Sequence, residues 1–366
     1  MIECLSTGLV YRNPKPYMRA VHAWHPSLVC LRENELVAAF DLGQAVESLD
    51  YRTYVCRSTD GGATWSEPVR MFEDPVPRRS VHTVRINRLS DGALIAMGGR
   101  IFRDDPEAGI INRENLGYVD TELIVLRSHD EGRTWEGPET VRPSLPGGRF
   151  EICHSVVELA DGRLLFPTAM FKTWEGEAPY GVRAVALVSH DKGETWPEHL
   201  DVIDQYDRGL TSWEQSLRQL PDGRLLAVCW ALNEGTGRSE PTPYALSEDG
   251  CSFSAPRPTG LRGQTAKIHP LSDGRILCLY RRDDRPGLWA NLSRMDGDRW
   301  VDLEEAPIWQ GAQSGMVGEG ASADELGALK FGFPGMVTLP GGDIMGYCWC
   351  CEDCVYGIRW FRIRVA

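Results

Sequence analysis

The chain has 366 residues, of which 42% are apolar, and it contains 38 glycines and 12 tryptophans. Its formal net charge of −13 argues against nucleic acid or an anionic membrane surface as the main partner, because both would repel an acidic protein. No apolar run approaches the ~20 residues of a membrane span, and the acidic, mixed residues 1–4 lead us to expect no secretion leader. We expect a soluble, turn-rich protein of the all-β class.

The stretch Ser-Thr-Asp-Gly-Gly-Ala-Thr-Trp at residues 58–65 returns along the chain. Close copies occupy residues 128–135 and 189–196, and degraded copies occupy residues 247–253 and 293–300. In this Asp-box pattern, S-x-D-x-G-x-T-W, Ser and Asp bond the turn backbone, Gly takes a conformation that other residues resist, and Trp packs beneath. Successive copies lie roughly 50 to 70 residues apart, close to the length of a four-stranded propeller blade with long loops.

A second repeat, out of phase with the first, joins two apolar strands through Leu-x-Asp-Gly. Clear copies begin at Leu89, Leu159, Leu220 and Leu271, and drifted copies begin at Leu31 and Leu339. Each copy predicts a β-hairpin with a short turn. Six hairpins, five of them followed by an Asp-box turn, predict one six-bladed β-propeller domain over residues 1–366. We expect the last strand, residues 358–365, to close the ring against a strand near residues 9–11.

Asp boxes between strands, with a Leu-x-Asp-Gly hairpin repeated six times, resemble the sialidase (neuraminidase) superfamily of six-bladed propellers with BNR repeats. The resemblance covers nearly the whole chain and implies the fold. For activity it implies a glycoside hydrolase acting at a chain end, although Asp boxes also occur in propellers that are not sialidases. In the family these boxes lie on the rim, away from the central cavity, so we interpret them as structural turns.

The first strand of each blade surrounds the propeller axis, so equivalent positions counted back from the six turns should face one cavity. Eight residues before each Asp position lie His25, Thr83, Cys153, Glu214, Thr265 and Phe333, with Trp24, His82, His154 and Trp213 beside them. Any single histidine has an ordinary interpretation as a hydrogen-bonded core residue. Because three imidazoles and a carboxylate come from different blades, we interpret the set as a functional site. A register slip of one residue would turn a side chain into the blade interior.

The catalytic residues that the resemblance implies are only partly present. The first family arginine falls on Trp24, the second falls on Trp230, and residues 300–310 offer no third. The nucleophilic tyrosine falls on Phe333, whose ring has no oxygen for attack. The family glutamate is present as Glu214, within the segment Trp-Glu-Gln-Ser at residues 213–216. The chain therefore has the scaffold of a sialidase without its full machinery.

An acid partner for Glu214 is sought in the loop before the first Asp box, where the family carries an aspartate. Asp50 is the nearest match, with Asp41 and Glu47 as alternatives. Glycoside hydrolysis commonly needs two carboxyl groups that flank the bond, so Glu214 and Asp50 would form a pair without tyrosine. Glu214 as a structural ion-pair partner and Asp50 as an ordinary loop residue both stay open.

A cavity histidine, His25 or His154, is the other candidate acid or base, because its pKa suits neutral pH. We also predict three groups of substrate-binding side chains. Each has a structural alternative: the arginines could form surface ion pairs, and the other side chains could belong to the core. Arginines in equivalent places on three blades would hold a carboxylate or sulfate, aromatic side chains would face a sugar, and one imidazole completes the set. These residues are Arg79, Arg149 and Arg262; Trp24, Trp213, Trp230 and Phe333; and His82.

Two other classes of function stay open. His25, His82 and His154 with Glu214 offer ligands for a divalent metal on the axis, which would support lyase or hydrolase chemistry on a uronic acid. No H-x-H or H-E-x-x-H spacing supports that site. A propeller that binds carbohydrate without catalysis would fit the missing arginines and tyrosine.

Eleven cysteines, an odd number lying mostly in strand-like runs, indicate reduced thiols in a cytoplasmic protein. The cysteine cluster at residues 348–354 is interpreted as a strand edge, with a metal site as the alternative. The sequence thus predicts a cytoplasmic propeller without a cofactor. We expect it to hydrolyse a terminal glycosidic bond in a small saccharide, anionic or neutral, other than an ordinary sialoside.

Overall fold

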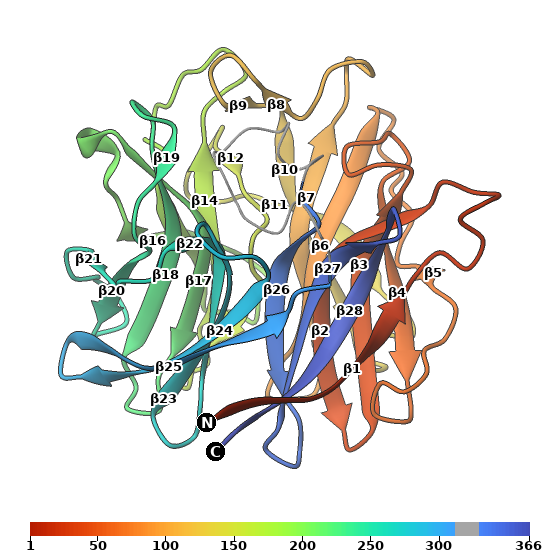
Figure 1. Cartoon of the computed structure of the whole chain (residues 1–366). Helices are drawn as coiled ribbons and strands as arrows, with labels where there is room; N and C mark the ends of the chain where they lie inside the picture. The colour runs from red at the N-terminus through yellow and green to blue at the C-terminus, as the bar shows by residue number, and fades with distance from the viewer. Residues whose placement is uncertain (312–328) are drawn as a thin grey trace.

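The computed structural model describes residues 1–311 and 329–366. Its strands form six antiparallel sheets arranged around a central axis (Figure 1). The first strand of each sheet lies nearest the axis, and long loops gather at the upper end of the ring in this view. The predicted six-bladed propeller is therefore confirmed. Among the described residues, no helix is long and apolar enough to cross a membrane.

The first three blades follow in chain order, each built from a hairpin and two further strands. The first blade contains β2 to β5, with bounds His22–Arg32, Glu35–Gly43, Arg52–Ser58 and Val69–Arg70. The second contains β6, β7, β10 and β11, with bounds Ser80–Arg88, Leu94–Phe102, Thr121–Ser128 and Glu136–Val141. The third contains β12 to β16, with bounds Arg149–Phe150, Val157–Glu158, Leu164–Phe171, Ala184–Ser189 and Glu198–Ile203.

The last three blades complete the ring. The fourth contains β17 to β21, with bounds Leu210–Gln219, Leu225–Asn233, Arg238–Ser239, Pro243–Ser247 and Arg257–Pro258. The fifth contains β22 to β25, with bounds Gly263–Pro270, Arg275–Arg282, Leu288–Asp296 and Arg299–Trp309. The sixth contains β26, β27, β28 and β1, with bounds Phe331–Thr338, Ile344–Glu352, Val355–Val365 and Ile2–Tyr11.

Ring closure occurs where the two ends of the chain share the sixth blade. Strand β1 pairs antiparallel with β28, from Ile2 opposite Val365 to Tyr11 opposite Ile358. The predicted closure is confirmed, and β1 is longer than the short N-terminal strand that the sequence indicated. The terminal residues also bond each other, because Met1 N donates to Ala366 O over 2.8 Å.

Both repeats form the turns that their residues predict. In each of the five Leu-x-x-Gly hairpins the glycine N–H donates to the leucine carbonyl, as from Gly92 to Leu89 over 3.0 Å, and these glycines have φ between 86° and 92°. In the first Asp box, Ser58 Oγ donates to Asp60 Oδ1 over 2.8 Å and accepts from Gly62 N over 2.8 Å. The most degraded box differs, since Ser293 Oγ donates to Asp302 rather than to the box aspartate.

The core lies between blades rather than at one centre. The second strand of each blade is packed on both faces, so β3 and β7 consist almost entirely of buried residues, whereas the outer β11 is mostly exposed. One cluster joins Val37 of β3 to Val84 of β6 and Ile124 of β10. Such contacts between adjacent blades fix the ring and hold the first strands in place around the axis.

An insertion between β7 and β10 rises at the loop-bearing end. It contains the two-stranded hairpin β8–β9, with bounds Ile111–Asn112 and Gly117–Tyr118 (Figure 1). Gly117 forms a parallel bridge with Lys172, and a Cβ added at this glycine would lie 2.1 Å from the carbonyl oxygen of Thr173. The chain therefore needs a residue without a side chain for this close approach. A short 3-10 helix, η1 (Tyr206–Arg208), precedes β17.

Candidate active site

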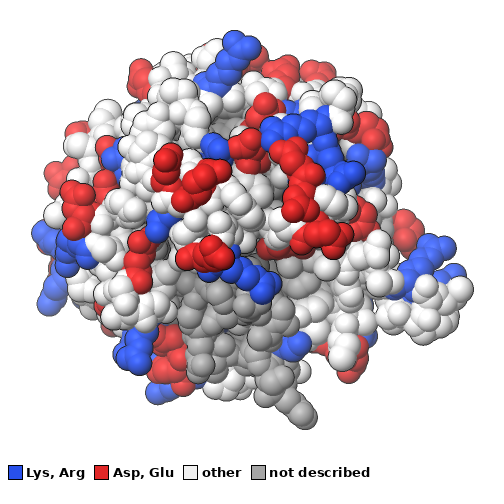
Figure 2. Space-filling model, turned by 90° about the horizontal axis from the view of Figure 1, so that it is seen from above, with Lys and Arg blue, Asp and Glu red and all other residues white. Residues whose placement is uncertain are grey.

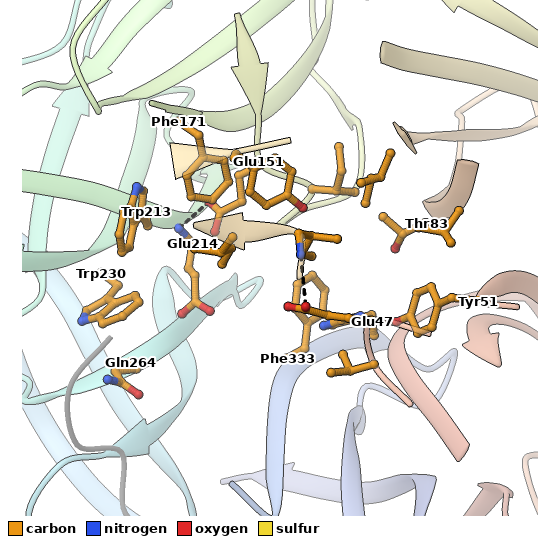
Figure 3. A pocket seen from close by; sticks show the side chains of 18 of the residues that line it. Glu47, Tyr51, Thr83, Glu151, Phe171, Trp213, Glu214, Trp230, Gln264 and Phe333 are labelled. Atoms are coloured by element: carbon orange, nitrogen blue, oxygen red, sulfur yellow. Dashed lines mark hydrogen bonds between the residues drawn. The ribbon is translucent and has the colours of Figure 1, made fainter. Parts of the chain in front are cut away.

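A cavity of about 210 Å³ occupies the axis at the loop-bearing end. Its floor and walls come from the first strands of several blades, and the β8–β9 hairpin supplies Ile111 and Tyr118. Figure 3 shows Glu151, Glu214 and the aromatic rings of Phe171, Trp213 and Trp230 on one side, with Thr83 and Tyr51 on the other. Seen from above in Figure 2, acidic and basic side chains are interspersed over the surface around this end.

The cavity side chains are aimed by β-bulges. His25, Glu214, Thr265 and Phe333 all have positive φ, between 46° and 55°, and each lies at a register shift in the pairing of the first and second strands. Such φ values are uncommon for residues other than glycine and cost free energy, so they concentrate at functional sites. Of the six register positions predicted from the sequence, four line the cavity: His25, Thr83, Glu214 and Phe333.

Glu151 and Glu214 form a carboxyl pair on adjacent blades. The backbone N–H of Glu214 donates to Glu151 Oε2 over 2.7 Å. Burial, reinforced by the negative charge of Glu214, raises the pKa of Glu151 to about 7. Burial also raises the pKa of Glu214, but Arg281 and Lys267 oppose this shift, so Glu214 is the member that ionises first. Its Oε2 is buried without a hydrogen-bond partner among the described residues, as expected of a group that receives a ligand.

His25 belongs to a second polar group on the opposite side. Its Nδ1 lies 2.5 Å from the hydroxyl oxygen of Tyr51 and 3.8 Å from Oδ2 of Asp41. Burial and the nearby Arg85 hold the pKa of His25 well below its usual range, while burial and Asp41 raise the pKa of Tyr51 well above its own. The imidazole and the phenol are therefore both neutral at pH 7, and they can donate or accept hydrogen bonds without carrying charge.

Two cationic side chains line the same cavity. Arg85 donates to Asp41 Oδ2 over 3.2 Å, and its guanidinium lies 4.6 Å from the ring centroid of Phe333. Arg281 donates to Gln264 Oε1 over 2.6 Å. Both are buried, at 2% and 5% exposure. A ligand in this cavity would therefore meet positive charge as well as the carboxyl pair.

The metal site that the sequence offered as an alternative does not assemble among the described residues. His82 lies outside the cavity lining, and its Nε2 forms a 2.6 Å hydrogen bond with Asp74. Burial lowers the pKa of His82 to about 4. His154 lies deeper along the axis, where its Nε2 is 2.6 Å from Arg218. Among residues 1–311 and 329–366, no three His, Cys, Asp or Glu side chains are grouped as metal ligands. This also applies to the cysteine cluster at the end of β27, whose thiols are free.

The loop before the first Asp box supplies a different carboxylate from the one predicted. Asp50 is exposed and accepts hydrogen bonds from the backbone and amide of Gln44, so it stabilises its own loop instead of lining the cavity. Glu47, an alternative in the sequence analysis, does line the cavity, and its Oε2 accepts the N–H of Ile110 over 3.1 Å (Figure 3). Asp41 is fully buried beneath the cavity and bonded to Thr53 and Thr83.

The three predicted substrate arginines lie outside the cavity lining, at the surface. Arg79 is exposed, Arg149 bonds Asp120, and Arg262 lies 3.3 Å from Asp283. Arg149 and Arg262 therefore pair with acidic side chains, which is the structural alternative to substrate binding that the sequence offered. Among the predicted aromatics, Trp213, Trp230 and Phe333 line the cavity, whereas Trp24 stacks on Tyr356 with ring centroids 4.0 Å apart.

Among the cavity residues that the sequence analysis missed are Glu151, Arg85, Tyr51 and Arg281. Glu151 and Arg85 lie two residues from the predicted positions Cys153 and Thr83, so strand alternation would have placed them on the same face. Tyr51 directly follows Asp50, in the loop that was searched. Arg281 comes from the second strand β23, which counting along first strands does not reach.

A family comparison agrees with this architecture. Residues 108–345 match the model of the BNR repeat-like domain family. The chain belongs to this family. The match begins in the second blade and ends in the sixth, so it includes Glu151, Glu214 and Phe333 but not His25 or Glu47.

Solved structures similar to this BNR repeat-like protein share its fold at low sequence identity. A protein of unknown function from Dyadobacter fermentans is 21% identical with a TM-score of 0.75, covering 100% of this chain and 99% of that one. The NanB sialidase of Streptococcus pneumoniae is 13% identical, with a TM-score of 0.66 and coverage of 98% and 70%. The sialidase of Trypanosoma rangeli, in complex with sialic acid, is 15% identical with a TM-score of 0.61; the chain spans about half of it, 54%.

Proposed function

We propose that this protein hydrolyses a terminal glycosidic bond, with Glu151 as the general acid and Glu214 as the base or nucleophile. The observation that carries this proposal is the carboxyl pair in one cavity, in which burial and the charge of Glu214 raise the pKa of Glu151 to about 7. Two carboxyl groups with different roles are the usual machinery of glycoside hydrolases. The fold shared with sialidases, one of them solved with sialic acid, supports a sugar as the substrate.

In the proposed mechanism Glu151 donates its proton to the glycosidic oxygen as the bond breaks. Glu214, whose negative charge is favoured by Arg281 and Lys267, either attacks the anomeric carbon or takes a proton from the attacking water. The aromatic side chains Trp213 and Trp230 would contact the apolar face of the sugar. Arg85 and Arg281 favour a substrate that carries an anionic group.

Glu47 is the second candidate for the acid, because it lines the same cavity in the loop before the first Asp box. A binding propeller without catalysis is the second candidate function. The observation that favours it is Phe333, which fills a bulge position equivalent to that of Glu214 with a ring that cannot react.

The test is hydrolysis of a panel of aryl glycosides, comprising neutral hexosides, hexuronides and a sialoside, by the full chain and its variants. We expect turnover of at least one substrate, with sialoside not the preferred one, and a loss of about 10²–10⁴-fold in kcat for Glu214→Gln. Glu139→Gln, on the exposed outer strand β11, is the matched control and should turn over normally.

Sugar binding measured on Glu214→Gln separates the two functions. Retained binding with lost turnover supports the enzyme. Binding of a sugar by the wild type, with no turnover of any glycoside, would leave the binding propeller. Efficient cleavage of a simple sialoside that depends on Glu214 would overturn the substrate class.

A further inference from the structure

The axial channel has a second opening at the end opposite the candidate active site. A cavity of about 530 Å³ lies there, lined by the last residues of the first strands, including Arg218 of β17, His269 of β22 and Thr338 of β26. A smaller cavity of about 30 Å³, lined by Phe333, Lys267 and other residues, lies between it and the upper cavity. The two cavities therefore present different side chains to solvent.

Arg218 is a partly buried cation without an acidic partner among the described residues. Its Nη1 donates to the carbonyl oxygen of Leu217 over 3.1 Å and lies 2.6 Å from Nε2 of His154, both of which are neutral. Its Nε and Nη2 make no hydrogen bond to any described residue, and none of the carboxylates in that part of the chain forms an ion pair with it. By contrast, the buried Arg85 and Arg100 each contact an aspartate.

His269, in the same lining, also forms no ion pair with a described carboxylate. His269 bonds Thr338 through Nε2 over 2.7 Å, and its Nδ1 is buried without a partner in the described structure. Burial and the charge of Arg218 lower the pKa of His269 to about 4, and burial lowers the pKa of Arg218 itself to about 10. Burial is the main cause of both shifts, and the positive charge of Arg218 adds to the shift of His269.

The other charged groups of this cavity leave the site open to an anion. Glu158 lies in the lining, but its two carboxylate oxygens accept the backbone N–H and the hydroxyl of Ser90 over 2.6 Å and 2.7 Å. Arg88 donates to the carbonyl oxygen of Leu31 over 2.7 Å and adds a second positive charge at the rim. Lys267, just above, bonds only backbone carbonyl oxygens in the described residues, those of Glu214 and Gln215.

We propose that this lower cavity is a binding site for a small oxyanion, such as phosphate or sulfate, held by Arg218 and His269. A guanidinium presents its N–H groups in a planar fork that matches oxyanion geometry. A partly buried cation without a counter-ion loses some of its hydration, and a bound anion offsets that cost while hydrogen-bonding the unpaired donors. The site does not share its anion-binding residues with the proposed catalytic pair, so either proposal can fail without the other.

The test is calorimetric titration of the full chain with inorganic phosphate and then sulfate at constant ionic strength, with chloride as the reference salt. We expect saturable binding to the wild type and at least a 10-fold weaker affinity for Arg218→Gln. Arg262→Gln, which removes an exposed arginine beside Asp283, is the matched control and should bind like the wild type. Equal affinity of Arg218→Gln and wild type, or no binding by the wild type, would overturn the site.

A second readout covers the case in which Arg218→Gln fails to fold. The imidazole resonance of His269, assigned by its loss in His269→Gln, should titrate at higher pH in phosphate than in chloride, because an adjacent anion favours the imidazolium. An unchanged titration of His269 would contradict the proposal.

Discussion

The two ends of the axial channel carry opposite electrostatic problems. At the loop-bearing end two carboxyl groups share a cavity, and burial together with the charge of Glu214 raises the pKa of Glu151 to about 7. At the opposite end Arg218 and His269 gather without a carboxylate that pairs with them among the described residues. The two sets share strand β17, which contributes Glu214 to one end and Arg218 to the other. A propeller can thus place different chemistry at the two ends of one strand.

The largest expected effect comes from substituting one residue at each end and measuring both activities on each variant. Glu214→Gln should reduce kcat by about 10²–10⁴-fold and leave phosphate affinity within about 2-fold of wild type. Arg218→Gln should weaken the phosphate affinity and leave kcat close to that of the wild type, because a smaller cavity lies between the two sites. Steady-state kinetics and calorimetry on both variants check this pattern. A loss of both properties in either variant would show that the ends are not independent.

The aromatic wall of the upper cavity should contribute mainly to substrate binding. Trp230 lines the cavity, and its indole N–H donates to Ser239 Oγ over 2.8 Å. Trp230→Ala should raise KM about 10-fold with kcat changed less than 3-fold, since it removes a contact present before and during the reaction. Trp230→Phe keeps an aromatic face and should recover most of the affinity. A fall in kcat at unchanged KM would exclude this role.

The carboxyl pair should make stability depend on pH. The folded-state pKa of Glu151 is raised from 4.5 to about 7, so its contribution to stability is fully present below pH ~4.5 and is lost as pH rises through about 7. Because glutamine has no carboxyl group to ionise, Glu151→Gln should not lose this stability as pH rises. At pH 8 the variant should gain on the order of 3 kcal/mol relative to its stability difference at pH 4. Urea unfolding at the two pH values measures this, and equal differences at both would contradict it.

The smallest effect is expected at the surface arginines that the sequence analysis assigned to the substrate. Arg262 is 63% exposed and paired with Asp283 over 3.3 Å. Arg262→Gln should change kcat/KM less than 2-fold and the free energy of unfolding by no more than about 0.5 kcal/mol. A larger loss of kcat/KM would return this arginine to the substrate-binding set.

Most of the fold could be predicted because it depends on local patterns that recur. The Asp of each Asp box and the Gly of each hairpin act within one turn, so their spacing alone gives the number of blades. Counting back from those turns also found His25, Glu214 and Phe333, because the bulges preserve the same offset in their blades.

The rest of the candidate site depends on contacts between segments that are distant in sequence. The three predicted histidines do not form one cluster. His82 and His154 lie one residue from the register positions, so their side chains contact Asp74 and Arg218 instead. The hairpin β8–β9 covers the cavity through a bridge to Lys172, which no repeat predicts. Pairing of Glu214 with Glu151 likewise requires the packing of two adjacent blades.

The most direct test of the catalytic pair is the pH dependence of kcat/KM on the best substrate of the panel, for wild type, Glu151→Gln and Glu47→Gln. A general acid must be protonated, so the wild-type profile should fall as pH rises through about 7, the pKa of Glu151. That limb should disappear in Glu151→Gln, together with most of the activity, and persist in Glu47→Gln. A limb that persists in Glu151→Gln and disappears in Glu47→Gln would contradict the assignment of the acid.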